Sequence, residues 1–280
     1  MSRHPRELDW ANVSLPDTWP DRLDMKRLRS VARLLVHLAR RRHAVSIPSD
    51  LQGREYIPAY VLQEFHNLPN GNYSNLFTRG YISGFDLSML GHMQRIRRLI
   101  GEKLAGCASV LDLGCGGGAT AAAIHDAGAS EVWGLDPSPY LLRHAAKDHP
   151  AIRFVHGVME DLPFPDACFD AVSVCFAFHE VPPPSIRVAL SEIARVLRPG
   201  AWMMIAEPSP AQFRTSLAGM IYRYGWQGLW FGMLARLMHE PYLGAWHEFA
   251  LEQEAAARGM RVVEEVDASP VRWWLLRRDG

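Results

Sequence analysis

Hydrophobic and polar residues follow two different patterns along the chain, and the change falls near residue 105. Before that point apolar residues recur every three or four positions, which predicts helices over residues 24–43, 55–66 and 87–104. Residues 1–21 contain three prolines and little periodicity, so we expect an irregular arm there. The first hundred residues are therefore expected to be mainly helical.

After residue 107 the pattern becomes short apolar strands separated by helical stretches. The strands are expected at Ser109–Leu113, Val132–Leu135, Arg153–Val155, Ala171–Cys175 and Ala201–Ile205. Strands that alternate with helices are typical of a parallel sheet with right-handed crossovers. Two late strands, Val262–Val266 and Val271–Leu276, meet around Ser269-Pro270 and are expected to form a hairpin at one sheet edge.

A long segment between the fifth strand and this hairpin, Pro208–Met260, has a helical pattern rich in Trp, Phe, Tyr, Leu and Met. Its most aromatic part, Met220–Leu234, is too apolar for a solvated helix, so we expect it to bury against another surface. Two surfaces fit that expectation. One is the N-terminal helices, and the other is a wall of a site for a lipid-like, quinone-like or polyketide-like molecule.

Charge and cysteine content narrow the choice of partner and compartment. Lys+Arg and Asp+Glu both total 30, which favours a small molecule over a nucleic acid. The basic residues of the helix at 24–42 ring an apolar stripe, which favours a solvated face over a contact with anionic lipid or RNA. The four cysteines form no C-x-x-C pair and suit free thiols in a reducing, cytoplasmic setting, and a homodimer stays open.

Two further patterns bear on the membrane. Residues 1–10 carry several charges and lack the apolar stretch of a secretory signal. Residues 213–238 form the most apolar window, but Arg214, Arg223, Gln227 and Arg236 interrupt it. We therefore expect no stable membrane insertion.

A glycine-rich turn follows the first strand and precedes an Ala-rich helix. Gly114-x-Gly116-x-x-Ala119 lets the backbone approach a ligand closely, but this spacing also suits the pyrophosphate of a dinucleotide. Asp112 at the mouth of the turn would repel pyrophosphate and attract the ammonium group of a methionine moiety. The charge pattern thus favours S-adenosylmethionine over NAD(P), although Asp112 could instead brace the loop.

The second strand ends in Gly134-Leu-Asp136-Pro-Ser138, with an acid at its tip about twenty residues after the glycine turn. Ribose hydroxyls are normally held at this place, so Asp136 is the ribose candidate. Its alternative role is to cap the helix over 138–147, a role that Ser138 could fill instead.

Taken in order, these segments resemble the class I S-adenosylmethionine-dependent methyltransferases, in the branch of the quinone-biosynthesis C-methyltransferases (methyltransferase type 11). The resemblance covers roughly residues 107–266 and rests on four segments: Val110–Gly118, Glu131–Ser138, Phe154–Val172 and Glu192–Gly200. It implies a Rossmann-like, doubly wound, seven-stranded and mostly parallel sheet. The cofactor would lie across the carboxyl ends of the first, second and fourth strands.

The same resemblance implies the organisation of the chain and the cofactor residues. A helical extension or lid would span 1–104 and the methyltransferase domain 105–280, with residues 208–250 as a helical insertion over the acceptor site. The residues expected to bind the cofactor are Asp112, Gly114, Cys115, Gly116, Asp136, Pro137, Met159, Glu160, Asp161, Cys175 and Tyr81. Val158 stands where the family often has an Asp, which puts more of the adenine recognition on backbone groups and Met159.

Methyl transfer from a sulfonium is an in-line displacement, so most of the catalysis should come from alignment in a site closed to water. If the acceptor is a hydroxyl or an acidic carbon, a histidine is the natural base. His179 follows the fourth strand and is the leading candidate, with Glu207 at the end of the fifth strand as the second. Each residue also has a purely structural alternative. His179 or Glu180 could brace the next helix, and Glu207 could interact with a helix terminus. His179-Glu180 is not H-E-x-x-H, so no metal is expected.

The sequence thus predicts methyl transfer from S-adenosylmethionine to an O or C centre of a small, largely apolar acceptor. Two other classes stay open. One is an NAD(P)-dependent oxidoreductase, which the glycine spacing supports and Asp112 opposes. The other is a non-catalytic module that keeps the cofactor fold as a scaffold for a partner protein.

Overall fold

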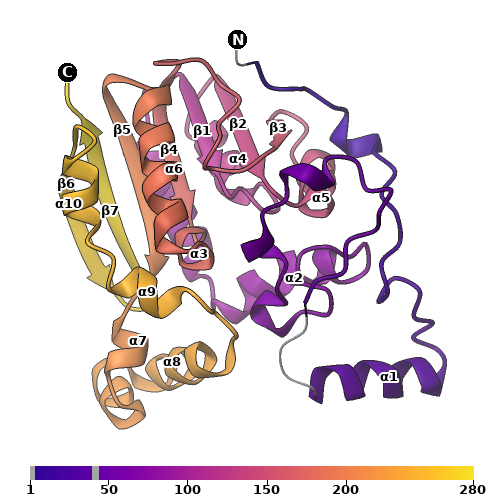
Figure 1. The fold of residues 1–280 in the computed structure, drawn as a ribbon. Coiled ribbons are helices and arrows are strands. Elements are labelled where there is room, and N and C mark those ends of the chain that lie inside the picture. Colours follow the sequence, from indigo (N-terminus) through magenta and orange to yellow (C-terminus); the bar gives the residue numbers. More distant parts are fainter. Residues whose placement is uncertain (1–3, 40–43) are drawn as a thin grey trace.

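The computed structural model describes residues 4–39 and 44–280, and a seven-stranded sheet forms its centre (Figure 1). The strands are β1 (Ser109–Leu113), β2 (Glu131–Asp136), β3 (Arg153–His156), β4 (Phe169–Cys175), β5 (Leu197–Pro208), β6 (Met260–Ala268) and β7 (Val271–Arg278). Their order is β3-β2-β1-β4-β5-β7-β6. Strands β1 to β5 pair in parallel, whereas β7 is antiparallel to β5 and β6. The expected mostly parallel sheet with a closing hairpin at its edge is confirmed.

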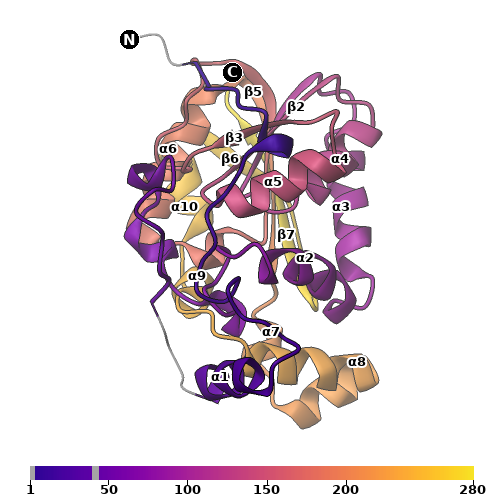
Figure 2. The same cartoon turned by 90° about the vertical axis from the view of Figure 1, so that its right-hand side faces the viewer.

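Helices cover both faces of this sheet, which makes three layers (Figure 2). On one face lie α3 (His92–Lys103), α4 (Ala119–Asp126) and α5 (Pro139–Asp148), and on the other lie α6 (Pro183–Val196), α9 (Leu243–His247) and α10 (Leu251–Ala256). Because both faces are covered, the inner strands are buried throughout. All five residues of β1 are buried, as the near-continuous apolar run in its sequence requires.

The N-terminal part differs from the expected three helices. Helix α1 (Leu28–Ala39) lies within the expected 24–43, of which residues 40–43 fall outside the described residues. The helix expected over 55–66 is wrong, because three short 3-10 helices stand there: η2 (Arg54–Tyr56), η3 (Ala59–Val61) and η4 (Phe65–Asn67). Pro58 interrupts the segment, and His66 and Asn67 adopt left-handed φ angles of 56° and 58°, which no continuous helix accepts.

The helix expected over 87–104 is split, and its first residues belong to a helix that the sequence reading missed. Helix α2 (Phe77–Ser88) ends before Leu90 and Gly91, whose φ angles are 51° and 80°, and α3 starts afresh at His92. A left-handed residue followed by a left-handed glycine reverses the chain. The regular spacing of apolar residues over 87–104 therefore continues across the turn between two helices.

The insertion before the hairpin is helical, as expected, and contains α7 (Ala211–Arg214) and α8 (Leu217–Leu237) besides α9 and α10. The expectation that its aromatic part is buried is wrong for several side chains. Met220 and Phe231 are buried, but Tyr222 is 92% exposed and Trp226 is 65% exposed. The reason is that α8 projects below the sheet in Figure 1 and covers the body of the protein along one side only.

Within the described residues, we find no helix that combines the length and apolar character needed to span a bilayer.

Candidate active site

The glycine-rich turn lies at the carboxyl end of β1, where neighbouring strands of a parallel sheet also end. Gly114 has a φ of 66°, and a Cβ added there would lie 2.6 Å from the Cβ of Ala177. Gly116 has a φ of 52°, and a Cβ there would meet only open space. The first glycine thus lets two loops approach, and the second leaves room above the turn for a ligand.

Asp112 lies beneath this turn and is 1% exposed. Its Oδ1 accepts a hydrogen bond of 2.6 Å from the Ser173 hydroxyl, while its Oδ2 is buried without a hydrogen-bond partner of standard geometry. Burial, partly offset by Ser173, raises the pKa of Asp112 to about 7. An unsatisfied buried oxygen is costly, so this position suits a cationic or hydrogen-bond donating ligand group above the turn.

Asp136 ends β2 and holds the turn in shape. Its Oδ2 accepts from the backbone N–H of Gly116 at 2.9 Å, and its Oδ1 accepts from the N–H of Ser138 at 2.8 Å. Ser138 caps α5, because its Oγ accepts from the N–H of Leu141. The capping alternative considered for Asp136 therefore falls to Ser138. Burial raises the pKa of Asp136 to about 7.

Two adjoining cavities, of about 100 and 90 Å³, surround this turn, and Gly114, Gly116, Tyr81 and Phe176 line both. Of the residues expected to bind the cofactor, eight line one or both cavities: Gly114, Cys115, Gly116, Asp136, Pro137, Met159, Cys175 and Tyr81. Apart from Tyr81 of α2, these residues lie at the ends of β2 and β4 or in the loops after β1, β2 and β3. The cavities thus lie at the carboxyl ends of the strands, where doubly wound sheets bind nucleosides.

Three of the expected cofactor residues do not line these cavities. Asp112 lies beneath the turn, as described above. Glu160 accepts a hydrogen bond of 2.8 Å from the hydroxyl of Tyr60, which itself lines the larger cavity, and Asp161 faces a different cavity beside the N-terminal arm. Their assignment to the adenine edge stays a prediction.

A third cavity, of about 500 Å³, adjoins the cofactor cavities and has an almost wholly apolar wall. It shares Tyr81 and Phe176 with both cofactor cavities and shares His66, Phe85 and His179 with the smaller one. Residues of α2, α7, α8, α9 and the loop after α8 form most of the remaining wall. A cavity of this size and polarity suits a small apolar molecule, held beside the turn.

His179 lies where the apolar cavity meets the cofactor cavities and is 2% exposed. Its Nδ1 is 2.6 Å from Oε2 of Glu207, whose Oε1 accepts from the backbone N–H groups of Ala177 and Phe178 at 3.0 and 2.8 Å. Glu207 is fully buried and does not line the apolar cavity. It orients His179 and the loop after β4, so we describe it as a positioning residue.

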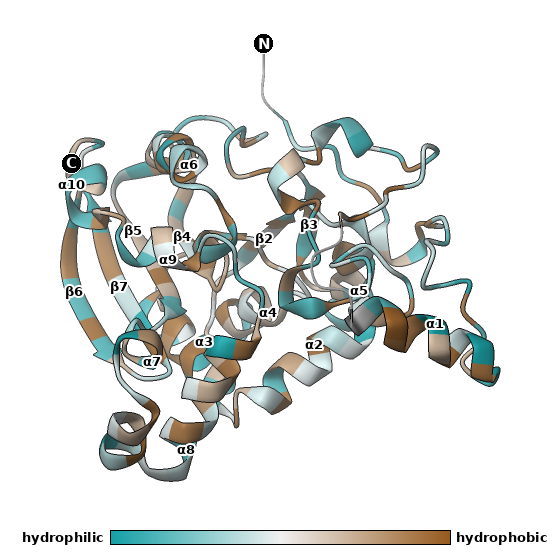
Figure 3. Cartoon of the chain, turned by 60° about the horizontal axis from the view of Figure 1, so that its bottom comes forward, coloured by the Kyte–Doolittle hydropathy of each residue, from teal (hydrophilic) through white to brown (hydrophobic). Residues whose placement is uncertain are grey.

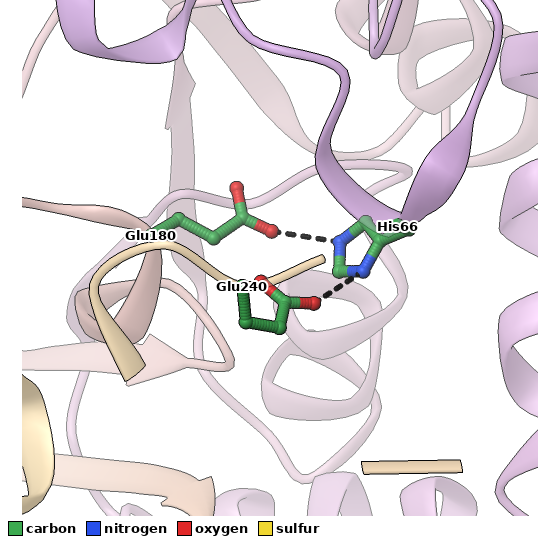
Figure 4. Close-up of side chains that lie close together, drawn as sticks. All are labelled: His66, Glu180 and Glu240. Atoms are coloured by element: carbon green, nitrogen blue, oxygen red, sulfur yellow. Dashed lines mark hydrogen bonds and ion pairs between the residues drawn. The ribbon is translucent and has the colours of Figure 1, made fainter. Parts of the chain in front are cut away.

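A second histidine, His66, faces the same cavity between two carboxylates (Figure 4). Its Nε2 is 2.8 Å from Oε1 of Glu180, and its Nδ1 is 2.6 Å from Oε1 of Glu240. Tyr81 stacks on the imidazole at 5.0 Å between ring centroids. The ligand atoms of His66, Glu180 and Glu240 lie close enough to hold a metal, but both imidazole nitrogens already face a carboxylate, so we describe the group as an ion-pair cluster.

Glu240 completes the polar end of the apolar cavity. Its Oε2 lies 3.8 Å from Nε2 of His179 and has no hydrogen-bond partner among the described residues. The carboxylate oxygen and the imidazole nitrogen are too far apart for a direct hydrogen bond, and a hydroxyl oxygen lying beside them could hydrogen-bond to both.

The charges in this cluster are set by burial and by the pairs. Burial opposes the charge of both imidazoles, but Glu240 and Glu180 raise the pKa of His66 to about 10, and Glu207 raises that of His179 to about 9. The pKa of Glu240 is lowered, because its two histidine neighbours outweigh its burial. At neutral pH both histidines are therefore protonated and Glu240 is ionised.

Sequence reasoning missed His66 and Glu240. His66 stands in a segment that was expected to be helical, and Glu240 follows α8 in a loop that carries no motif. A polar residue next to a long apolar helix gives no sign that it will face a histidine 61 positions away in sequence. Glu240 and His179 come together only because of the way the insertion before the hairpin folds.

One family match falls on this part of the chain. Residues 110–200 match the model of a family described as a methyltransferase domain. An uncharacterised methyltransferase of Synechocystis is 43% identical over 91 residues, which cover 32% of this chain and 42% of that protein. A demethylmenaquinone methyltransferase of Renibacterium salmoninarum is 35% identical over 135 residues, which cover 46% of this chain and 56% of that protein. The chain thus spans about half the length of these relatives.

A crystal structure of a Pyrococcus horikoshii protein has a TM-score of 0.51 at 19% identity, over 68% of this chain and 92% of that one, which shows a shared fold. The cofactor that goes with the matched family is S-adenosylmethionine. The room above Gly116, the unsatisfied oxygen of Asp112 and the placing of Asp136 all fit it. By its glycine turn, its sheet order and its matched domain, the chain is similar to the class I S-adenosylmethionine-dependent methyltransferases, and residues 110–200 form its methyltransferase-like domain.

Proposed function

We propose that this protein transfers a methyl group from S-adenosylmethionine to an oxygen or acidic carbon of a small apolar acceptor that carries a hydroxyl group, such as a phenol or a quinol. The observation that carries the proposal is the contact between the apolar cavity and the cofactor cavities at Tyr81, Phe176 and His179. The names of relatives such as the demethylmenaquinone methyltransferases support a quinone-like acceptor.

In this proposal the chain holds the cofactor by its turn. Gly114 and Gly116 would lie against the methionine part, Asp112 would supply negative charge near the ammonium group, and Asp136 and Pro137 would hold the ribose. Met159 would pack on the adenine, and Cys115 and Cys175 would give neutral contacts, because burial raises the pKa of the Cys175 thiol to about 12. When bound, S-adenosylmethionine supplies an electrophilic methyl group on a sulfonium.

The acceptor hydroxyl would lie beside His179 and Glu240. It would accept a hydrogen bond from the protonated Nε2 of His179 and donate one to the free Oε2 of Glu240. These contacts would align the acceptor atom with the methyl group that S-adenosylmethionine supplies, and Glu240 would take the acceptor proton as the methyl group is transferred and S-adenosylhomocysteine is left. The role foreseen for His179 as base thereby moves to Glu240, since the raised pKa of His179 makes it a donor.

Residues of the N-terminal part close the site, and we propose that they act as a lid. Tyr60 and Tyr73 wall the larger cofactor cavity, and the two cofactor cavities, of about 100 and 90 Å³, are smaller than ligand sites of about 300 Å³ or more. The segment from η2 to α2 must therefore shift for the cofactor to enter. Hydrogen exchange at residues 56–81 should slow when S-adenosylhomocysteine is added, and unchanged exchange there would argue against a lid.

Two measurements test the proposed function. Isothermal titration with S-adenosylhomocysteine and separately with NADPH should show binding of the first alone, and Asp136→Asn should weaken it. Binding of NADPH alone would favour the oxidoreductase, and binding of neither would favour the scaffold. The second measurement is release of S-adenosylhomocysteine from S-adenosylmethionine with a panel of phenols, quinols and fatty acids. Cofactor binding without turnover on any of them would count against the proposal.

A further inference from the structure

One end of the molecule carries hydrophobic side chains that no other part of the described chain covers. Helices α1 and α8 both lie at the lower end in Figures 1 and 2, and Figure 3, seen from that end, shows hydrophobic residues along both. Trp226, Trp230, Met233 and Leu237 of α8 are 65, 41, 44 and 66% exposed. Their spacing of four, three and four residues puts them on one face of the helix.

This exposed stripe of α8 is about 16 Å long, from the helical rise of 1.5 Å per residue. It is continuous, whereas a soluble surface usually scatters its apolar residues singly. Helix α1 adds Leu28 and Leu35, one heptad apart on one face and 86 and 61% exposed. We call these six residues the α1–α8 face.

The charged residues within helices α1 and α8 are all basic. Helix α1 carries Arg29 and Arg33 and helix α8 carries Arg223, all exposed, and neither helix contains an Asp or a Glu. Helices that lie in the headgroup region of a bilayer are rich in tryptophan and arginine. There the indole ring is partly solvated and the guanidinium group binds lipid phosphate. A partner for this face must therefore be apolar at its centre and anionic at its rim.

The apolar cavity reaches the surface at the same end. Met25, just before α1 and 44% exposed, lines it, and so do Leu234 and Met238 at the end of α8. A molecule could therefore pass from the α1–α8 face into the cavity along an apolar path.

We propose that the α1–α8 face docks onto an anionic lipid bilayer, with the tryptophans and leucines at the acyl boundary and the arginines against lipid phosphates. The docking rests on this surface alone. The consequence that the acceptor enters the site from the bilayer rests on the proposed function.

The test is co-sedimentation of the full chain with vesicles of phosphatidylcholine alone and with 30% phosphatidylglycerol added. We expect binding to the anionic vesicles and loss of more than tenfold in affinity for the double variant Trp226→Ser/Leu237→Ser. A matched control, Tyr56→Ser/Val263→Ser, removes two apolar side chains of 61 and 46% exposure elsewhere and should bind like the parent protein. Replacing Arg29 and Arg33 by Gln should lower the affinity for the anionic vesicles about fivefold for each arginine.

Three outcomes would overturn the proposal: no binding of the parent protein to anionic vesicles, equal loss in the control variant, or a dimer in light scattering that the stripe variant dissolves. The last result would make the face an interface between two copies. Turnover of a water-soluble phenol without vesicles should be the same in the parent protein and the stripe variant. Failure of that turnover in both proteins would concern the proposed function and not the docking.

Discussion

Glu240→Gln removes the proposed proton acceptor while keeping its shape. The amide oxygen can still accept from Nδ1 of His66, now at 2.6 Å from Oε1 of Glu240, so the change is mainly the loss of one negative charge. His179 keeps Glu207 at 2.6 Å and His66 keeps Glu180 at 2.8 Å, so both imidazoles retain a carboxylate partner. The apolar wall that binds the acceptor is untouched.

A positioned base contributes about 10² to 10⁴ in rate, so kcat should fall at least about 100-fold, or about 2.7 kcal/mol in the barrier. The KM for the acceptor and the Kd for S-adenosylhomocysteine should stay within about threefold, because the glutamine side chain can still hydrogen-bond the acceptor and no apolar wall residue or turn residue changes. The assay is the rate of S-adenosylhomocysteine release with the best acceptor of the panel. Glu248→Gln, an exposed glutamate of the same insertion, is the matched control and should behave like the parent protein. A Glu240→Gln variant with the parental kcat would refute the reasoning.

Four further results are expected. Gly114→Ala should lower cofactor affinity by more than tenfold in titration, because φ is 66° and the new Cβ meets Ala177 at 2.6 Å, while Gly244→Ala, with nothing within 4 Å, should not. Ser138→Ala should cost about 1 kcal/mol in denaturant unfolding, as it removes the cap of α5. His66 has a folded pKa near 10, above the usual 6.5, so its stabilisation is complete below pH 6.5 and is lost as pH rises through 10. His66→Gln should flatten the decline of the free energy of unfolding between pH 6.5 and 10. His125→Gln, at a half-exposed site, should leave that decline unchanged. Turnover should fall above about pH 9, where His179 loses its proton, and a flat profile to pH 10.5 would argue against its role as a donor.

The sheet could be predicted from the sequence because each parallel strand is buried on both faces and therefore reads as an apolar run. The expected Ser109–Leu113 has the bounds of β1, and β2 to β5 extend their expected ranges by a few residues. The cofactor side of the site was also readable, because a glycine with positive φ and an acid at a strand tip are local requirements. Gly114 and Asp136 meet them within a few residues of the strand ends.

The other half of the site could not be read in this way. His66 and Glu240 lie far from His179 in sequence, and only the packing of η4 and of the loop after α8 brings the three together. The burial of α8 was overestimated for a related reason. A helical pattern shows which side chains share a face, but not whether another element covers that face, and Trp226 and Leu237 share one that stays exposed.

The site has a cofactor side and an acceptor side, and the two sides come from different parts of the chain. This limits how far the acceptor of a relative can be inferred for this protein. The matched domain spans residues 110–200, and of the described residues that line the apolar cavity only Phe176 and His179 fall inside it. Every other wall residue comes from the N-terminal part, from the end of β5 or from the segments after β5, and Glu240 is among them. Similarity within 110–200 therefore bears more directly on the cofactor side of the site than on the acceptor. The cavity itself is the better guide to the acceptor, and its apolar wall with a polar end at His66, His179 and Glu240 favours the proposed apolar molecule with a hydroxyl group at its reactive end.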